Sequence, residues 1–155
     1  MQQASRDTTP VRTEHDTWPD AGPRQLGTLP QMVSEVMSRP VCVPSTASLT
    51  RVGRALGHGH VRALVVVDES KRPLGVITPE GLLAVVSQRQ QTSLGDMRAV
   101  DAPLLRAAVL PDTTRVDMAA HVLARTPSDF ALVTSRTGAI EGLVFAGDVL
   151  RALGW

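Results

Sequence analysis

Aromatic residues, cysteines and long apolar runs are scarce in this chain of 155 residues. Aromatics make up 3% of it, with no Tyr, which excludes the base-stacking platforms of single-strand nucleic-acid-binding proteins. Cys42 is the only cysteine, so an intramolecular disulfide and a thiolate metal cluster are excluded. Its valine neighbours predict a small buried hydrophobe. No apolar run approaches the length of a membrane span, and no signal-peptide pattern is found, which predicts a cytoplasmic protein.

Charge of one sign is also lacking. The chain has 16 basic and 15 acidic side chains and a formal net charge of +1, so neither nucleic acid nor an anionic membrane is expected as a partner. No nucleophile elbow, Ser-His-Asp pattern or phosphate-binding glycine fingerprint is found. His58 and His60 lack enough further ligands for a metal site and are predicted to be a surface pair. We therefore expect no catalytic residues and no metal.

Two parts of the chain differ in pattern. Residues 1–30 are polar, contain several prolines and show neither a helical nor a strand period, which predicts a disordered N-terminal tail. From there the chain matches itself at an offset of 67 residues without a gap. We therefore expect two units, residues 31–90 and 91–155, that share one core because neither alone buries much surface. The matching positions are Pro44 and Pro111, Leu56 and Leu123, Val66 and Val133, Gly75 and Gly142, and Leu83 and Leu150.

Hydrophobic periodicity predicts the same element order, β-α-β-β-α, in both units. In the first unit we expect a helix over 32–37, strands at 41–43, 64–67 and 74–78, and two helices. One of these helices carries the stripe Leu49, Val52 and Leu56, and the other begins at Pro79 and runs through Leu82, Leu83, Val85 and Val86. In the second unit we expect strands at 107–110, 130–134 and 140–145. One of its helices carries the stripe Val116, Ala119, Ala120 and Leu123, and a second helix with Val149, Leu150 and Leu153 closes the unit.

These patterns resemble a known module. The segments VMSRP (36–40), LVVVD (64–68) and PLGVIT (73–78), with GLV (142–144) and Asp148, are similar to those of a pair of cystathionine-β-synthase (CBS) domains, or Bateman module. The resemblance covers about residues 31–153. It implies an α/β fold in which two tandem CBS repeats pack as one pseudo-twofold module. It also implies a stand-alone, non-catalytic regulatory module that senses an adenosine-containing ligand, forms a homodimer and modulates a partner protein of unknown identity.

The ligand motif of this family is Gly, two apolar residues, Thr or Ser, two variable residues and Asp. A hydroxyl at the strand end can hold phosphate beside the amides of a helix N-terminus, and the carboxylate can accept both ribose hydroxyls. The first unit has Gly75 and Thr78, but Gly81 stands in place of the carboxylate. The second unit has Gly142 and Asp148, but a phenylalanine, residue 145, stands in place of the hydroxyl.

Arg62 in the first unit aligns with Asp129 in the second, each just before a central strand. An arginine favours phosphate and an aspartate repels it. We therefore predict that the cleft of Thr78 and Arg62 favours phosphate, whereas the cleft of Asp148 and Phe145 favours a nucleoside or an S-adenosyl group. The candidate ligands are AMP, ADP, ATP and S-adenosylmethionine, and the candidate ligand-binding residues are Thr78, Asp148, Arg62, Phe145, Gly75 and Gly142.

A second interpretation of the same residues stays open. Gly75 and Gly142 can serve only a turn or a close approach, Thr78 and Asp148 can cap helices, and Phe145 can fill an empty cleft as core. The chain would then be a ligand-free dimerisation or docking scaffold with degenerate clefts. Whether Phe145 lines or fills its cleft separates the two interpretations.

Overall fold

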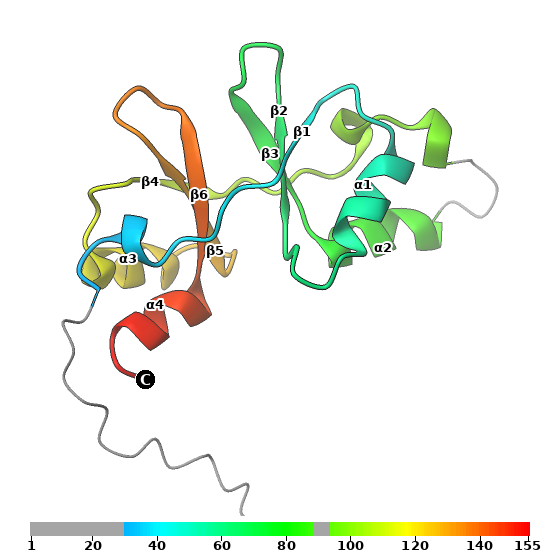
Figure 1. Ribbon diagram of the computed structural model, residues 1–155. Helices are drawn as coiled ribbons and strands as arrows, with labels where there is room; N and C mark the ends of the chain where they lie inside the picture. Colours follow the sequence, from blue (N-terminus) through cyan, green and yellow to red (C-terminus); the bar gives the residue numbers. More distant parts are fainter. Residues whose placement is uncertain (1–29, 89–93) are drawn as a thin grey trace, which may run out of the picture.

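The computed structural model describes residues 30–88 and 94–155, and the predicted tail, up to residue 29, lies outside this part of the chain. Figure 1 shows two sheets side by side, with α1 and α2 beside one and α3 and α4 beside the other. The expected α/β class and element order are confirmed.

In the first repeat the elements are β1 (Cys42–Pro44), α1 (Leu49–Leu56), β2 (Leu64–Val67), β3 (Pro73–Ile77) and α2 (Pro79–Gln88). In the second they are β4 (Ala108–Pro111), α3 (Val116–Leu123), β5 (Phe130–Thr134), β6 (Ile140–Phe145) and α4 (Ala146–Ala152). Three short 3₁₀ turns are η1 (Val33–Glu35), η2 (Leu94–Asp96) and η3 (Ala99–Asp101).

Both sheets have the same topology. The first has the order β1-β2-β3, with β1 parallel and β3 antiparallel to the central strand, and the second repeats this with β4-β5-β6. The register irregularity near the end of the hairpin also recurs, between Val66 and Val67 and between Val133 and Thr134. The internal repeat found in the sequence is therefore a repeat of backbone structure down to the position of a bulge.

The central strands are buried on both faces, as the apolar run 64–67 predicts. Leu64 and Val66 point into the core beneath α1 and α2, whereas Val65 and Val67 point into a separate cluster with residues of β5 and β6. The two sheets thus pack against each other through their second faces. This inter-repeat cluster consists of Ala63, Val65, Val67, Val76, Phe130, Leu132, Leu143 and Phe145.

The segment before each repeat crosses to the other repeat. Ser38 exchanges two backbone hydrogen bonds with Leu143 of β6, at 2.8 and 3.0 Å, and Leu105 does the same with Val76 of β3, at 2.9 Å each. Both pairs are related by the offset of 67 residues. Val33 packs in the core of the second repeat, and Met97, Ala99 and Ala102 pack in the core of the first. Each repeat is therefore completed by chain that precedes its neighbour.

The expected helix over residues 32–37 does not form, because this segment crosses to the second repeat. Only one 3₁₀ turn, η1, forms within residues 32–37, because the backbone there is engaged elsewhere. The amide of Val33 donates to Thr114 and that of Ser38 to Leu143. The apolar spacing of the segment reflects burial against the second repeat and not a helical period.

Two expected helices carry exposed apolar residues, which are Leu83 and Val86 of α2 and Leu150 of α4, with Leu153 just beyond it. One prediction of burial is wrong, because Cys42 is exposed, at the rim of a hollow near Lys71. Partial desolvation there raises the pKa of its thiol, and the nearby ammonium of Lys71 opposes this effect.

Candidate functional site

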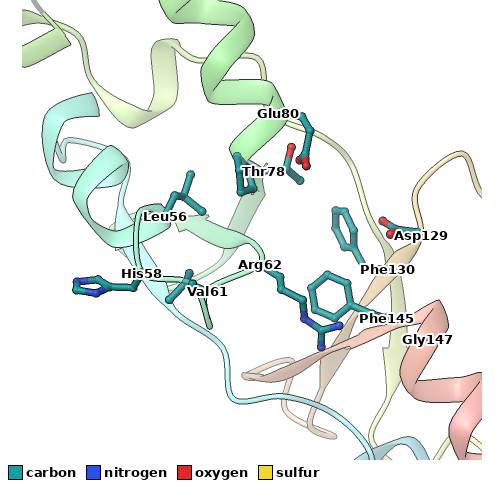
Figure 2. Close-up of a pocket in the computed structure, with 12 residues that line it drawn as sticks. Leu56, His58, Val61, Arg62, Thr78, Glu80, Asp129, Phe130, Phe145 and Gly147 are labelled. Carbon is teal, nitrogen blue, oxygen red and sulfur yellow. The ribbon is translucent and has the colours of Figure 1, made fainter.

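Several cavities lie where the repeats meet, and two of them share Arg62 as a lining residue. The Thr78 cavity has a volume of about 460 Å³ and the Ser38 cavity about 350 Å³, and both lie in the range of small-molecule sites. Arg62, Val61 and Phe145 line both. The Thr78 cavity is also lined by Leu56, His58, Gly59, Pro79, Glu80, Asp129, Phe130 and Gly147, and the Ser38 cavity by Arg39, Val41, His60, Ala63 and Leu143. Figure 2 shows the Thr78 cavity.

Asp148 is the one buried charged or polar residue in the described part of the chain. It lies in the first turn of α4, where its carboxylate accepts the amide hydrogen of Phe145 at 3.1 Å and so caps its own helix. The guanidinium groups of Arg62 and Arg151 also donate to this carboxylate. Its side chain is only 7% exposed and lines neither cavity. The carboxylate therefore lies behind the guanidinium of Arg62.

Arg62 is held by three contacts from the second repeat and the crossing segment. Its Nη2 atom lies 3.1 Å from Oδ2 of Asp148 and 3.2 Å from Oγ of Ser38. Its Cζ atom lies 3.7 Å from the centroid of the Phe145 ring, as a cation–π contact (Figure 2). These contacts join a residue just before β2 to a carboxylate 86 residues later.

The cleft of Phe145 is lined and not filled by this residue. Its ring is buried in the inter-repeat cluster, 5.7 Å from the Phe130 ring, and Arg62 covers one face. Space remains on both sides, because the ring lines both cavities. By the criterion set from the sequence, this observation favours the ligand-binding interpretation.

Thr78 lies at the start of α2, where its Oγ1 accepts the amide hydrogen of Gly81 at 3.2 Å. Thr78 therefore caps α2, which is the alternative role that the sequence allows, and its side chain also lines the cavity. Glu80 and Asp129 line the same cavity, so two carboxylates face the space where a phosphate was expected (Figure 2).

The charges around the two clefts differ from the expectation. Asp129 lines the Thr78 cavity, and Arg62, although it lines both cavities, pairs with Asp148. The Ser38 cavity is lined by Arg39, His60 and Arg62 and by no carboxylate. Apart from the shared Arg62, the arginine lining is thus in the Ser38 cavity, on the side where Nη2 of Arg62 contacts both Ser38 and Asp148, which we call the Asp148 side. Ser38 and Arg39 have no signal of their own in the sequence beyond their place in the VMSRP segment that carries the resemblance.

Gly75 and Gly142 line neither cavity, and both lie under crossing segments. A Cβ atom at Gly142 would lie 2.6 Å from the carbonyl oxygen of Ser38, and one at Gly75 would lie 2.5 Å from Cβ of Leu104. Close approach of the crossing segment accounts for both glycines. They shape the site by allowing the exchange of segments.

The pair His58 and His60 adds no metal site within the described residues. The rings of His58 and His60 are 5.9 Å apart, and residues 30–88 and 94–155 contain no group of three or more His, Cys, Asp or Glu side chains that could hold a metal ion. In the same residues, none of the helices has the length and apolar character needed to cross a membrane.

Comparisons with known proteins identify the fold. Residues 33–88 match the family model of the CBS domain. The comparison with curated protein sequences gave no match. Among solved structures, the CBS-pair protein CBSX2 from Arabidopsis thaliana is 22% identical with a TM-score of 0.67, and the alignment covers 80% of this chain and 94% of that chain. The CBS-domain protein ATU1752 from Agrobacterium tumefaciens is 20% identical with a TM-score of 0.68, covering 83% and 98%.

Two further structures contain nucleotides. CBSX2 in complex with AMP is 23% identical with a TM-score of 0.63, and the alignment covers 79% of this chain and 95% of that chain. The CBS domain of a bacterial CNNM/CorC family Mg²⁺ transporter in complex with ATP is 20% identical with a TM-score of 0.67, covering 79% and 86%. At this level of identity the likeness establishes the fold.

Proposed function

Because this chain is a tandem CBS module, we propose that it is a non-catalytic regulatory protein that senses an adenosine nucleotide and modulates a partner protein in the cytoplasm. The observation that carries the proposal is Asp148, a buried carboxylate placed at the junction of the repeats beside two cavities. A carboxylate at this motif position suits the two ribose hydroxyls. Nucleotide-bound CBS structures of the same fold support the ligand class.

The position of the site suggests how binding is transmitted. Asp148 belongs to the second repeat, whereas Arg62 belongs to the first and Ser38 to the crossing segment. A ligand that engages these groups changes the contacts between the repeats. It alters the affinity for a partner only if it binds one arrangement of the repeats better than another.

Thermal unfolding of the purified chain tests the proposal against AMP, ADP, ATP, adenosine, S-adenosylmethionine and NAD. A ligand that binds only the native state adds about 2.7 kcal/mol of stability at a hundredfold excess over its dissociation constant, so the midpoint must rise. We expect a shift with AMP that is lost in Asp148→Ala. The matched control Asp129→Ala, which removes a carboxylate from the Thr78 cavity, should keep it. Millimolar ligand without any shift would reject nucleotide sensing.

A ligand-free scaffold is the second candidate, and exposed apolar residues on equivalent helices favour its dimerisation component. Leu83 of α2 is 66% exposed and Leu150 of α4 is 52% exposed. Val86 and Leu153 are a second exposed pair at the same offset of 67 residues. A pseudo-twofold pair of apolar helical surfaces suits a self-complementary interface between two copies. We therefore propose that the module is a homodimer through α2 and α4, with or without a nucleotide.

A further inference from the structure

We infer that Arg62 determines which adenosine ligands the module accepts. Its guanidinium pairs with the Asp148 carboxylate, which is the proposed partner of the ribose, until a phosphate group of the ligand attracts it away. This inference rests on the proposed nucleotide site and adds its selectivity. Three relationships carry it: the occupancy of the Asp148 carboxylate, the position of Arg62 between that carboxylate and the cavities, and the charge of the Ser38 cavity.

The Asp148 carboxylate is almost fully used by the protein itself. A carboxylate offers about four acceptor positions. The Phe145 amide and Arg62 both donate to Oδ2, and Arg151 donates to Oδ1. A ribose brings two hydroxyl donors to this carboxylate. One of the three protein donors must therefore leave before both hydroxyls can be accepted.

Arg62 is the donor that a ligand meets. It lines both cavities, whereas Arg151 lines neither and the Phe145 amide is part of the backbone. The side chain of Arg62 is 46% exposed and that of Arg151 is 70% exposed, so both can move toward solvent, and the place of Arg62 in the cavities makes it the one that a ligand contacts. Its departure also frees the face of the Phe145 ring that it now covers. The guanidinium of Arg62 thus occupies the position on the Phe145 ring where a flat ligand group would stack.

The Ser38 cavity can hold the phosphate that would replace Asp148 as the partner of Arg62. Arg39 and Arg62 line this cavity and no carboxylate does, so an anion placed there faces two guanidinium groups. A phosphate placed in it can accept two hydrogen bonds from the guanidinium of Arg62 and so replace Asp148 as its partner. Adenosine has no anionic group that could accept these hydrogen bonds, so it would leave Arg62 in competition for Asp148.

The consequence is a preference for phosphorylated adenosine ligands at the Asp148 side. This is the reverse of the preference for a nucleoside or S-adenosyl group that the sequence predicts for this cleft. The Thr78 cavity cannot offer the same exchange, because Glu80 and Asp129 face it.

Titration calorimetry with AMP and adenosine tests the inference on the wild-type chain, Arg62→Ala and the control Arg54→Ala. In the wild type we expect AMP to bind at least about tenfold more tightly than adenosine. In Arg62→Ala we expect adenosine to bind more tightly than in the wild type and AMP more weakly, so that the ratio approaches one. The control Arg54→Ala removes an exposed guanidinium of α1 that lines neither cavity, so it should keep the wild-type ratio. An unchanged ratio in Arg62→Ala, or an equal loss in both variants, would overturn the inference.

A second probe separates failure of this inference from failure of the proposed function. Inorganic phosphate is compared with chloride at equal ionic strength, and the unfolding midpoint is measured. We expect phosphate to raise the midpoint of the wild type and of Arg54→Ala but not that of Arg62→Ala. If no adenosine ligand binds any variant while this pattern holds, nucleotide sensing is wrong and the phosphate exchange at Arg62 stands. If phosphate acts equally on all three chains, the exchange is wrong.

Discussion

Lys71 and Gly138 occupy equivalent positions in the hairpins β2–β3 and β5–β6, and both have a positive φ angle, 64° and 83° respectively. The tight turn requires this left-handed conformation in each repeat. Glycine adopts it freely, whereas a residue with a Cβ atom is strained there by roughly 1–2 kcal/mol. The second repeat therefore has the residue that suits the turn, and the first repeat has a lysine under strain.

Replacing Lys71 by glycine should stabilise the protein. The relief of strain exceeds the greater backbone entropy that glycine loses on folding, which leaves a net gain of up to about 1 kcal/mol. Chemical unfolding of Lys71→Gly should show a higher midpoint with an unchanged slope. The matched control Lys71→Ala removes the same side chain but keeps the strain, so it should show no comparable gain. Equal effects of the two substitutions would mean that the turn is not strained.

Replacing Gly142 by alanine should be costly. The added Cβ atom would lie 2.6 Å from the carbonyl oxygen of Ser38, so β6 or the crossing segment must move and their two hydrogen bonds must weaken. We expect a loss of about 1–3 kcal/mol in the free energy of unfolding. The control is Gly147→Ala, because no atom lies within 4 Å of the added Cβ and alanine favours a helix by about 0.5–1 kcal/mol. Similar stabilities of the two variants would contradict the close approach.

Substitution of Leu83 by aspartate should separate the proposed dimer. A charge in the centre of an apolar interface must be desolvated without a partner, which strongly disfavours association. Light scattering after gel filtration should give the mass of two chains for the wild type and of one for Leu83→Asp. Val109→Asp changes an equally apolar, exposed residue of β4, away from α2 and α4, and should remain dimeric. A monomeric wild type would reject the interface outright.

The elements could be predicted from the sequence because their signals are local. The buried face of α1 consists of Leu49, Val52 and Leu56, as the spacing indicates, and Ser48 caps this helix by accepting the amide hydrogen of Arg51. The candidate site was predicted in part: Asp148 and Phe145 lie at the junction of the repeats, and Thr78 lines a cavity there. Whether they bind a ligand stays a prediction.

The sequence by itself determined the repeat, the strand and helix order and the motif positions, since these depend on hydrophobic spacing, caps and turns within a few residues. Only the tertiary structure decided that Arg62 pairs with Asp148, 86 residues away, and that Asp129 faces Thr78. It also decided that Leu83 and Leu150 are exposed. A helix period identifies an apolar face but not what covers it, and charge pairing depends on how the crossing segments bring the repeats together.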